Sequence, residues 1–181
     1  MGKAEFFAWL QMREGGRYEL KDGAIVMHAG SRLQHARLSG RFLAAIARQL
    51  DLEEWFVVMA DFAVTIGDDI RYPDVVAARA DSDPAALSTD SPVFIIEVLS
   101  PSSTGRDMVE KLAEYTTLPS LEAYVVASQD EAIAWVWQRD ADTRAFPAQP
   151  VEIAGFKGFI IIEALGVTLP LSEIYRGIAN A

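Results

Sequence analysis

Two carboxylates, Asp74 and Glu97, have the sequence surroundings of a metal site. Glu97 lies inside the segment Val93–Leu99 and has apolar neighbours on both sides. A single carboxylate in such surroundings is costly unless it is paired or coordinates a metal. Asp74 follows Pro73, and proline belongs at the start of a strand because it removes one donor from the sheet. We expect the two acids to lie on adjacent strands with a divalent cation between them, and oxygen ligands favour Mg²⁺ or Mn²⁺.

A structural role for the same acids is the competing interpretation. Glu97 would then form a buried ion pair with Arg71 or Arg79, and Asp74 would only close a turn. The sequence leaves open which group lies next to the Glu97 carboxylate.

Asp107, Lys111 and Tyr115 recur every four residues and therefore share one face of a predicted helix. This helix follows the Glu97 strand, so its first turns are expected over the C-terminal end of that strand, where ligand sites gather in α/β sheets. Lys111 then supplies an ammonium group near the acids, whereas we expect Tyr115 to pack. The alternative is an exposed Asp107–Lys111 ion pair, worth only a few tenths of a kcal/mol.

Two further polar residues stand in less specific contexts. Glu19 leads into the turn dipeptide Asp22-Gly23. His35 lies on a predicted helix, and we expect a structural role for it because a single histidine is weak evidence for a metal ligand. Arginines on the same helix form either a phosphate-facing strip or, as we favour, a solvated face: Arg37, Arg41 and Arg48.

Other chemistries have no support in the sequence. It contains neither a Gly-x-Gly-x-x-Gly motif nor a Gly-Lys-Ser/Thr phosphate loop. Ser100, Ser102 and Ser103 are not in a nucleophile-elbow context. The chain has no cysteine, which excludes disulfides, thiolate zinc sites and cysteine nucleophiles.

The composition predicts one globular α/β domain over residues 1–181, with 51% hydrophobic and 23% charged residues. No apolar run approaches the roughly 20 residues of a membrane helix, and the first ten residues do not form a signal peptide. We therefore expect a cytoplasmic protein without membrane contact. The net charge of −10 argues against nucleic acid as a partner, although an acidic chain can carry a local basic strip.

Hydrophobic periodicity predicts four helices. Ser31 is expected to cap the longest of them, whose apolar stripe consists of Leu38, Phe42, Ile46 and Leu50. The predicted helices are Glu5–Met12, Ser31–Leu52, Asp107–Leu118 and Leu171–Ile178.

Strand patterns occupy most of the remaining chain. The near-continuous apolar segment Val93–Leu99 predicts a central strand covered on both faces, and the helix after it predicts a crossover to a parallel neighbour, Ala123–Ala127. Ala132–Gln138 and Thr143–Phe146 are expected to form a hairpin closed by Arg139–Asp142. The other predicted strands are Arg17–Leu20, Ala24–Met27, Trp55–Met59, Phe62–Ile66, Asp74–Ala78 and Phe159–Glu163, and residues 81–92 are predicted to form a surface loop.

These motifs occur together in an order that resembles the Uma-two family of the restriction-endonuclease-like PD-(D/E)xK superfamily. The resemblance runs from about Arg17 to Val126. Its most specific part is the sequence from Glu97 to Ser103, Glu-Val-Leu-Ser-Pro-Ser-Ser, followed by the helix with Asp107, Lys111 and Tyr115. The remaining parts are Arg17–Gly23, His35, Pro73–Val75 and Glu122–Tyr124.

The resemblance implies a restriction-endonuclease-like core, with a central mixed β-sheet flanked by helices and additional β-hairpins. Asp74 and Glu97 would bind the metal, and the backbone carbonyl of Val98 would complete the chelate. The superfamily pattern expects a lysine at position 99, which is leucine here. In relatives of this kind the lysine has moved to the following helix, and Lys111 of this chain matches that lysine. Glu19 would be an additional catalytic acid.

The function implied by the resemblance is a metal-dependent endonuclease. It would hydrolyse phosphodiester bonds of nucleic acid, with DNA favoured and with Mg²⁺ or Mn²⁺ as cofactor. The alternative, motivated by the acidic composition, is a catalytically retired module that uses the same fold for protein association. A homodimer is compatible with either function.

Overall fold

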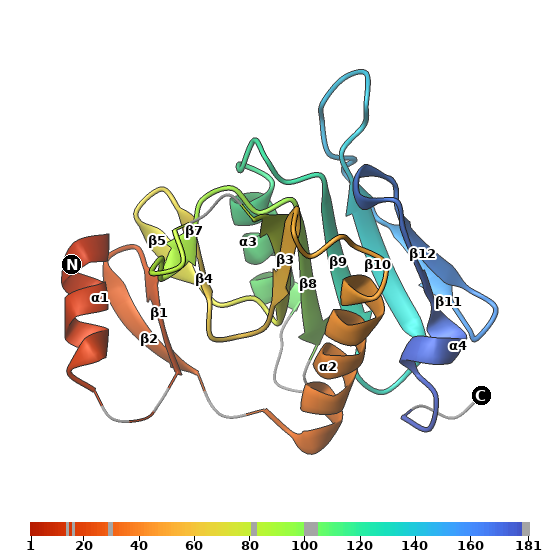
Figure 1. The fold of residues 1–181 in the computed structure, drawn as a ribbon, viewed down its shortest axis with the longest axis horizontal. Helices are drawn as coiled ribbons and strands as arrows, with labels where there is room; N and C mark the ends of the chain where they lie inside the picture. The colour runs from red at the N-terminus through yellow and green to blue at the C-terminus, as the bar shows by residue number, and fades with distance from the viewer. Residues whose placement is uncertain (14, 16, 29–30, 81–82, 100–104, 179–181) are drawn as a thin grey trace.

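A six-stranded mixed sheet carries the two acids that the sequence singles out. The computed structural model describes residues 1–13, 15, 17–28, 31–80, 83–99 and 105–178, with backbone alone for 28 and 105–108. The strands of this sheet are β3 (Trp55–Val58), β6 (Val75–Arg79), β8 (Phe94–Leu99), β9 (Ala123–Ser128), β10 (Ile133–Gln138) and β11 (Val151–Ala154). Their order is β11-β10-β9-β8-β6-β3, in which β8 and β9 are parallel and all other neighbours are antiparallel. Strands β8 to β11 lie side by side in Figure 1.

Strand β8 is covered on both faces, as its apolar sequence predicts. Phe94 and Ile96 point into one hydrophobic cluster, whereas Ile95 points into another on the opposite face. Glu97 lies on the same face as Ile95, because side chains alternate along a strand. Helix α3 (Gly105–Tyr115) follows β8, and the chain then returns as β9 in parallel, so the predicted crossover is confirmed.

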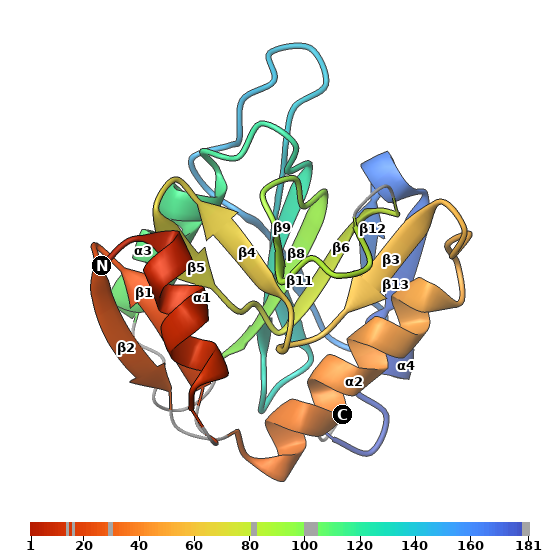
Figure 2. The ribbon, with the colours of Figure 1, turned by 60° about the vertical axis from the view of Figure 1, so that its left-hand side comes forward.

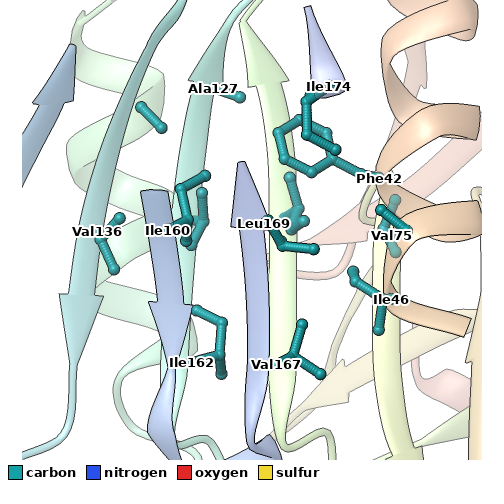
Figure 3. Close-up of a cluster of buried hydrophobic side chains, with 14 of the residues drawn as sticks. Phe42, Ile46, Val75, Ala127, Val136, Ile160, Ile162, Val167, Leu169 and Ile174 are labelled. Atoms are coloured by element: carbon teal, nitrogen blue, oxygen red, sulfur yellow. The ribbon is translucent and has the colours of Figure 1, made fainter. Parts of the chain in front are cut away.

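The first face of the sheet packs against helix α2 (Leu33–Ala47), the hairpin of β12 (Phe159–Ile162) and β13 (Val167–Pro170), and helix α4 (Leu171–Ile174). Figure 3 shows Phe42 and Ile46 of α2 beside the apolar side chains of this hairpin. Leu38, Phe42 and Ile46 have no exposed surface, and burial of each contributes about 1.5–3 kcal/mol. The predicted apolar stripe therefore sets the orientation of α2 on the sheet.

The opposite face packs against α3 and faces a second, five-stranded sheet of order β2-β1-β5-β4-β7. Figure 2 shows the first four of these strands beside α1. Helix α1 (Lys3–Gln11) covers this smaller sheet by inserting Phe6 into its apolar side. The single-turn helix η1 (Glu163–Leu165) connects β12 to β13. The strands of the smaller sheet are β1 (Arg17–Lys21), β2 (Ala24–His28), β4 (Ala63–Ile66), β5 (Asp69–Arg71) and β7 (Ser88–Thr89).

The predicted turn at Asp22-Gly23 is confirmed. Strands β1 and β2 pair with Lys21 opposite Ala24, which leaves a two-residue loop. Both loop residues have positive φ, 50° for Asp22 and 74° for Gly23, as a type I′ hairpin turn requires.

The predicted strand Thr143–Phe146 is wrong. The antiparallel partner of β10 is β11, with Ile133 opposite Ala154. Asp140 instead accepts hydrogen bonds from the backbone N–H groups of Asp142 and Thr143, and Arg144 has a φ of 58°. These local contacts satisfy the backbone in a turn, so the segment does not need a strand partner.

The ends of two predicted helices also differ. Helix α2 begins at Leu33 with Arg32 as its N-cap, and no side chain caps it, so the predicted role of Ser31 is wrong. Helix α4 ends at Ile174 and not at Ile178. Within the described ranges, no helix combines the length and the apolar character that crossing a bilayer demands.

Candidate functional site

Asp74 and Glu97 lie opposite each other at one end of the large sheet. Strands β6 and β8 pair Val75 with Ile96, and continuing this antiparallel register by one residue brings Asp74 opposite Glu97. The pairing is closed by the backbone N–H of Val98, which donates to Asp74 Oδ2 at 2.7 Å. The structure therefore brings both predicted metal-binding carboxylates, and the residue whose carbonyl was expected to join them, to one place.

The Asp74 carboxylate is held at both oxygens. Oδ2 accepts the Val98 N–H, and Oδ1 lies 2.7 Å from Nε2 of His35. Side-chain exposure is 14% for Asp74 and 10% for His35, so both groups are largely removed from water. Hydrogen bonds to a carboxylate are about twice as strong as neutral ones, and two of them fix the carboxylate plane.

Glu97 is buried, and its partners come from α3. Lys111 Nζ and the Tyr115 hydroxyl each lie 3.0 Å from Oε1 and donate to it. The alternative in which Glu97 pairs with an arginine is wrong, because Arg71 contacts Glu19 and Glu114, and Arg79 contacts Glu54. The expectation that Tyr115 only packs is also wrong. Asp107, on the same helix, lies outside the residues whose side chains are described.

Burial raises the pKa of the Glu97 carboxyl to about 7. The Lys111 ammonium opposes this shift, and the carboxylates of Asp74 and Glu19 add to it. Burial and the negative charge of Glu97 also raise the pKa of Tyr115 well above its usual value. Among the described residues, the Lys111 ammonium only partly offsets the effect of burial on Glu97, and a cation beside this carboxylate would be stabilised by it.

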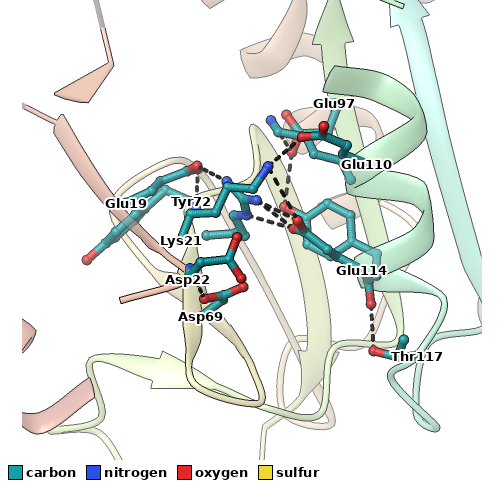
Figure 4. A network of polar contacts seen from close by, with 12 residues as sticks. Glu19, Lys21, Asp22, Asp69, Tyr72, Glu97, Glu110, Glu114 and Thr117 are labelled. Atoms are coloured by element: carbon teal, nitrogen blue, oxygen red, sulfur yellow. Dashed lines mark hydrogen bonds and ion pairs between the residues drawn. The ribbon is translucent and has the colours of Figure 1, made fainter. Parts of the chain in front are cut away.

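Glu19 belongs to a buried ion-pair network next to the site. Its Oε2 accepts a hydrogen bond from Nη1 of Arg71 at 2.8 Å, and its Oε1 accepts the Tyr72 N–H at 3.1 Å (Figure 4). Arg71 also donates to both oxygens of Glu114 on α3, at 2.9 and 2.7 Å. The pKa of Arg71 is raised, because hydrogen bonds and charge from both glutamates outweigh its burial.

This network connects the smaller sheet to α3. Lys21 on β1 forms an ion pair with Glu110, one turn before Glu114 (Figure 4). Lys111 and Tyr115, the neighbours of these glutamates in sequence, point to Glu97. The two glutamates thereby hold α3 in the orientation that places Lys111 at the site.

Sequence reasoning missed the roles of Arg71, Glu114 and His35. The alternation of charged and apolar residues in Ile70-Arg71-Tyr72 is typical of a half-buried strand. The acids that pair with Arg71 are far away in the sequence, so neighbouring residues give no indication of them. Glu110 and Glu114 share a helix face by spacing, which gives a weak signal. His35 was placed on the correct helix, and its contact with Asp74 depends entirely on how that helix packs.

The arginines of α2 do not form a continuous strip for phosphate. Arg41 donates to the backbone carbonyls of Ile174 and Arg176, and Arg48 forms an exposed ion pair with Glu173. Both side chains therefore attach α2 to the C-terminal segment. Arg37 is exposed, in agreement with a solvated helix face.

The donors around Asp74 and Glu97 fit a hard divalent cation. Among the residues that the structure describes, no three His, Asp or Glu side chains gather into a metal-binding group. The available set is the Asp74 carboxylate, Oε2 of Glu97, which lies beside the oxygen held by Lys111, and the backbone carbonyl of Val98. Mg²⁺ is commonly held by one or two carboxylates together with waters and substrate phosphates, so this set is sufficient for it.

A solved structure shares the fold of this chain. A crystal structure described as "a putative nuclease belonging to DUF820" from Anabaena variabilis ATCC 29413 has a TM-score of 0.76 and 14% sequence identity, and the match covers 97% of each chain. It confirms the predicted fold class, a mixed α/β sheet with flanking helices of the restriction-endonuclease-like kind.

Two relatives come from Synechocystis sp. strain PCC 6803, and both are called uncharacterized. The protein sll1609 is 27% identical over 116 residues, which is 61% of this chain and 66% of that protein, so the match spans just under two thirds of its length. The protein slr1290 is 24% identical over 180 residues, which is 97% of this chain and 91% of that protein.

The Uma2 family model, described as "Putative restriction endonuclease", matches residues 4–172. This range contains the paired acids, the Lys111 helix and both sheets. The chain belongs to the Uma2 family.

Proposed function

We propose that this chain is a metal-dependent endonuclease that hydrolyses phosphodiester bonds of nucleic acid, with DNA as the favoured substrate. The observation that carries the proposal is the arrangement of Asp74, Glu97 and Lys111. Asp74 directly precedes β6 and is bound to the N–H of Val98, the residue after Glu97 on β8, and the Lys111 ammonium lies 3.0 Å from Glu97. Membership in the Uma2 family, described as "Putative restriction endonuclease", supports it.

Asp74, Glu97 and the carbonyl of Val98 would hold Mg²⁺ or Mn²⁺. When bound, such a cation polarises a phosphoryl oxygen and lowers the pKa of bound water. The protein supplies two carboxylates whose orientation is already fixed, Asp74 by two hydrogen bonds and Glu97 by Lys111 and Tyr115. Preorganised groups of this kind do not need to reorganise during the reaction.

Lys111 is assigned the role of the lysine that the superfamily pattern expects at position 99. Its ammonium lies on the helix that crosses over the end of β8, and Glu97 holds it beside the acids. From there it is placed to orient an attacking water or to offset negative charge at the phosphorus. Lysine suits this position because its charge is compact and its stem is flexible.

The net charge of −10 conflicts with a polyanionic substrate, and the exposed arginines near the start of α2 reduce this conflict only in part. Residues 28–50 contain four arginines and no acidic residue. Arg32 and Arg37 are exposed and flank His35, which contacts Asp74. If these arginines contribute to substrate binding, that binding should weaken as salt increases.

The test is a cleavage assay with defined substrates. Supercoiled plasmid, single-stranded DNA and RNA are incubated with the protein in Mg²⁺, in Mn²⁺ or in EDTA. Cleavage is expected with metal and not with EDTA, and Asp74→Asn should abolish it while the circular dichroism spectrum stays unchanged. Asp142→Asn, an exposed acid in the turn after β10, is the matched control and should retain full activity.

The competing function, a retired nuclease fold used for protein association, predicts a different result. Wild-type protein would then leave every substrate intact, and calorimetric titration with Mg²⁺ and Mn²⁺ would detect no binding that depends on Glu97. This pair of results would overturn the nuclease proposal.

A further inference from the structure

We infer that His35 is a positioning residue, which orients the Asp74 carboxylate for the cation. The inference rests on the proposed function and extends it to a residue outside the acid–lysine set. Its basis is the 2.7 Å contact between His35 Nε2 and Asp74 Oδ1, which joins α2 to the start of β6 across 39 positions of sequence.

The packing of α2 holds the His35 ring in place. His35 lies in the first turn of the helix and is only 8% exposed. Leu38 and Phe42 follow on the same face at helical spacing, and both are completely buried against the large sheet. The ring therefore reaches Asp74 from a rigid element, which suits a group that has to hold a ligand in one orientation.

The hydrogen-bonding pattern assigns the tautomer of His35. A carboxylate can only accept, so the Nε2 contact places a proton on Nε2 of the imidazole. Nδ1 is buried and has no partner among the described residues. In the neutral ring this Nδ1 atom carries a lone pair and no N–H group, so no donor is buried without an acceptor. The hydrogen bond between His35 Nε2 and Asp74 Oδ1 thus fixes the orientation of both the imidazole ring and the carboxylate.

His35 and Val98 together fix the carboxylate of Asp74. Val98 N–H donates to Oδ2 and His35 Nε2–H to Oδ1, so each oxygen keeps a lone pair for a cation. Groups that hydrogen-bond to a metal ligand typically change metal affinity by about 10- to 100-fold when they are removed. Loss of the His35 donor is expected to leave the ligands in place but free Asp74 to rotate.

The experiment measures Mn²⁺ affinity by calorimetry in wild-type protein and in three variants. His35→Met removes the donor but keeps an apolar side chain of comparable length, and affinity should fall by about 10- to 100-fold. His35→Gln places an amide N–H near the position of Nε2 and should restore most of the affinity. Ser39→Ala is the matched control, because it removes a buried side-chain hydrogen bond to the His35 carbonyl in the same helix and leaves the imidazole intact.

The possible outcomes separate this inference from the proposed function. If wild-type protein does not bind Mn²⁺, the metal-dependent function fails as well. If wild-type protein binds and His35→Met binds equally well, or if Gln is as weak as Met, the positioning role is wrong and the nuclease proposal stands.

A measurement without metal covers the case in which His35→Met does not fold. The ¹⁵N spectrum of the histidine side chains in metal-free wild-type protein should show the proton of His35 on Nε2, and His35→Gln identifies the signal by its loss. A proton on Nδ1 with a bare Nε2 would overturn the inference.

Discussion

The Tyr115 hydroxyl lies 3.0 Å from Glu97 Oε1, the same oxygen that accepts the Lys111 ammonium. Tyr115 is completely buried, and its ring packs at 5.4 Å from that of Tyr124. A buried carboxylate therefore receives two donors from one helix, and both act on one of its two oxygens. This arrangement fixes the rotamer of Glu97 before any cation is present.

Removing the Tyr115 hydroxyl should cost stability and metal affinity together. In Tyr115→Phe the ring packing is retained, and the free energy of unfolding should fall by about 1–3 kcal/mol because a hydrogen bond to a buried charged group is lost. Mn²⁺ affinity should fall as well, since Glu97 loses one of the two contacts that orient it. Urea unfolding and calorimetry measure the two effects.

Tyr175→Phe is the control for this prediction. Its hydroxyl also lies on a buried ring, but it donates to the backbone carbonyls of Ser128 and Ile133, away from the acids. It should lower stability to a similar extent and leave Mn²⁺ affinity unchanged. Equal Mn²⁺ affinities in Tyr115→Phe and wild-type protein would show that the hydroxyl has no part in metal binding.

Lys111 should be required for cleavage and not for metal binding. In Lys111→Met the ammonium is removed from Glu97, which takes away a positive charge that competes with the cation. Removal of this charge should offset the loss of a contact that orients Glu97, so Mn²⁺ affinity should not fall, whereas cleavage of plasmid DNA should fall by at least about 100-fold. A variant that still cleaves at the wild-type rate would remove Lys111 from the proposed mechanism.

Glu97 should make the stability of the metal-free protein decrease as pH rises. Its pKa in the folded state is raised from 4.5 to about 7, chiefly by burial. Because the folded-state value is the higher one, the stabilisation is complete below about pH 4.5 and is lost as pH rises through 7. Urea unfolding between pH 5 and 8 should show this decrease, and it should be smaller in Glu97→Gln.

Added metal should reverse this trend. A cation binds the ionised carboxylate, so Mg²⁺ should raise the unfolding midpoint more at pH 8 than at pH 5.5. Equal stabilisation at both pH values would mean that the cation does not bind at Glu97.

Arg71 should be the most important of the paired arginines for stability. It is 4% exposed and lies between Glu19 and Glu114, so Arg71→Met takes the positive charge away from two acids, one of them buried. Breaking such a pair typically costs about 3–5 kcal/mol. Arg48→Met, which removes an exposed ion pair with Glu173, should cost less than about 1 kcal/mol.

A double variant separates charge from packing in this network. Glu19→Gln combined with Arg71→Met removes the negative charge of Glu19 together with the guanidinium that pairs with it. It should recover part of the stability lost in Arg71→Met alone, and thermal unfolding of wild-type protein, the two single variants and the double variant measures the difference. If the double variant is as unstable as the sum of the two single ones, the two side chains are not coupled.

Much of the fold could be predicted from local patterns. The apolar run around Glu97 predicted a strand covered on both faces, the spacing of Leu38, Phe42 and Ile46 predicted the buried side of α2, and Asp22-Gly23 predicted a tight hairpin. Each of these signals depends on interactions between residues a few positions apart. The prediction of a strand at Thr143–Phe146 was wrong because strand propensity does not take account of side-chain hydrogen bonds. Asp140 accepts such bonds from the backbone and stabilises a turn there.

The arrangement of the site depends on local sequence patterns and on tertiary packing. The sequence by itself determined that Glu97 would be buried and would need a partner, that Asp74 stands at a strand start, and that Lys111 and Tyr115 share a helix face. Only the tertiary structure decided that the partner is Lys111 and not Arg71, that Glu19 is tied to Arg71, and that His35 reaches Asp74. The physical reason is that helical spacing alone defines which side chains lie together on one face of a helix. Packing between segments far apart in the chain sets the direction in which that face points, and it also sets the register that brings β6 beside β8.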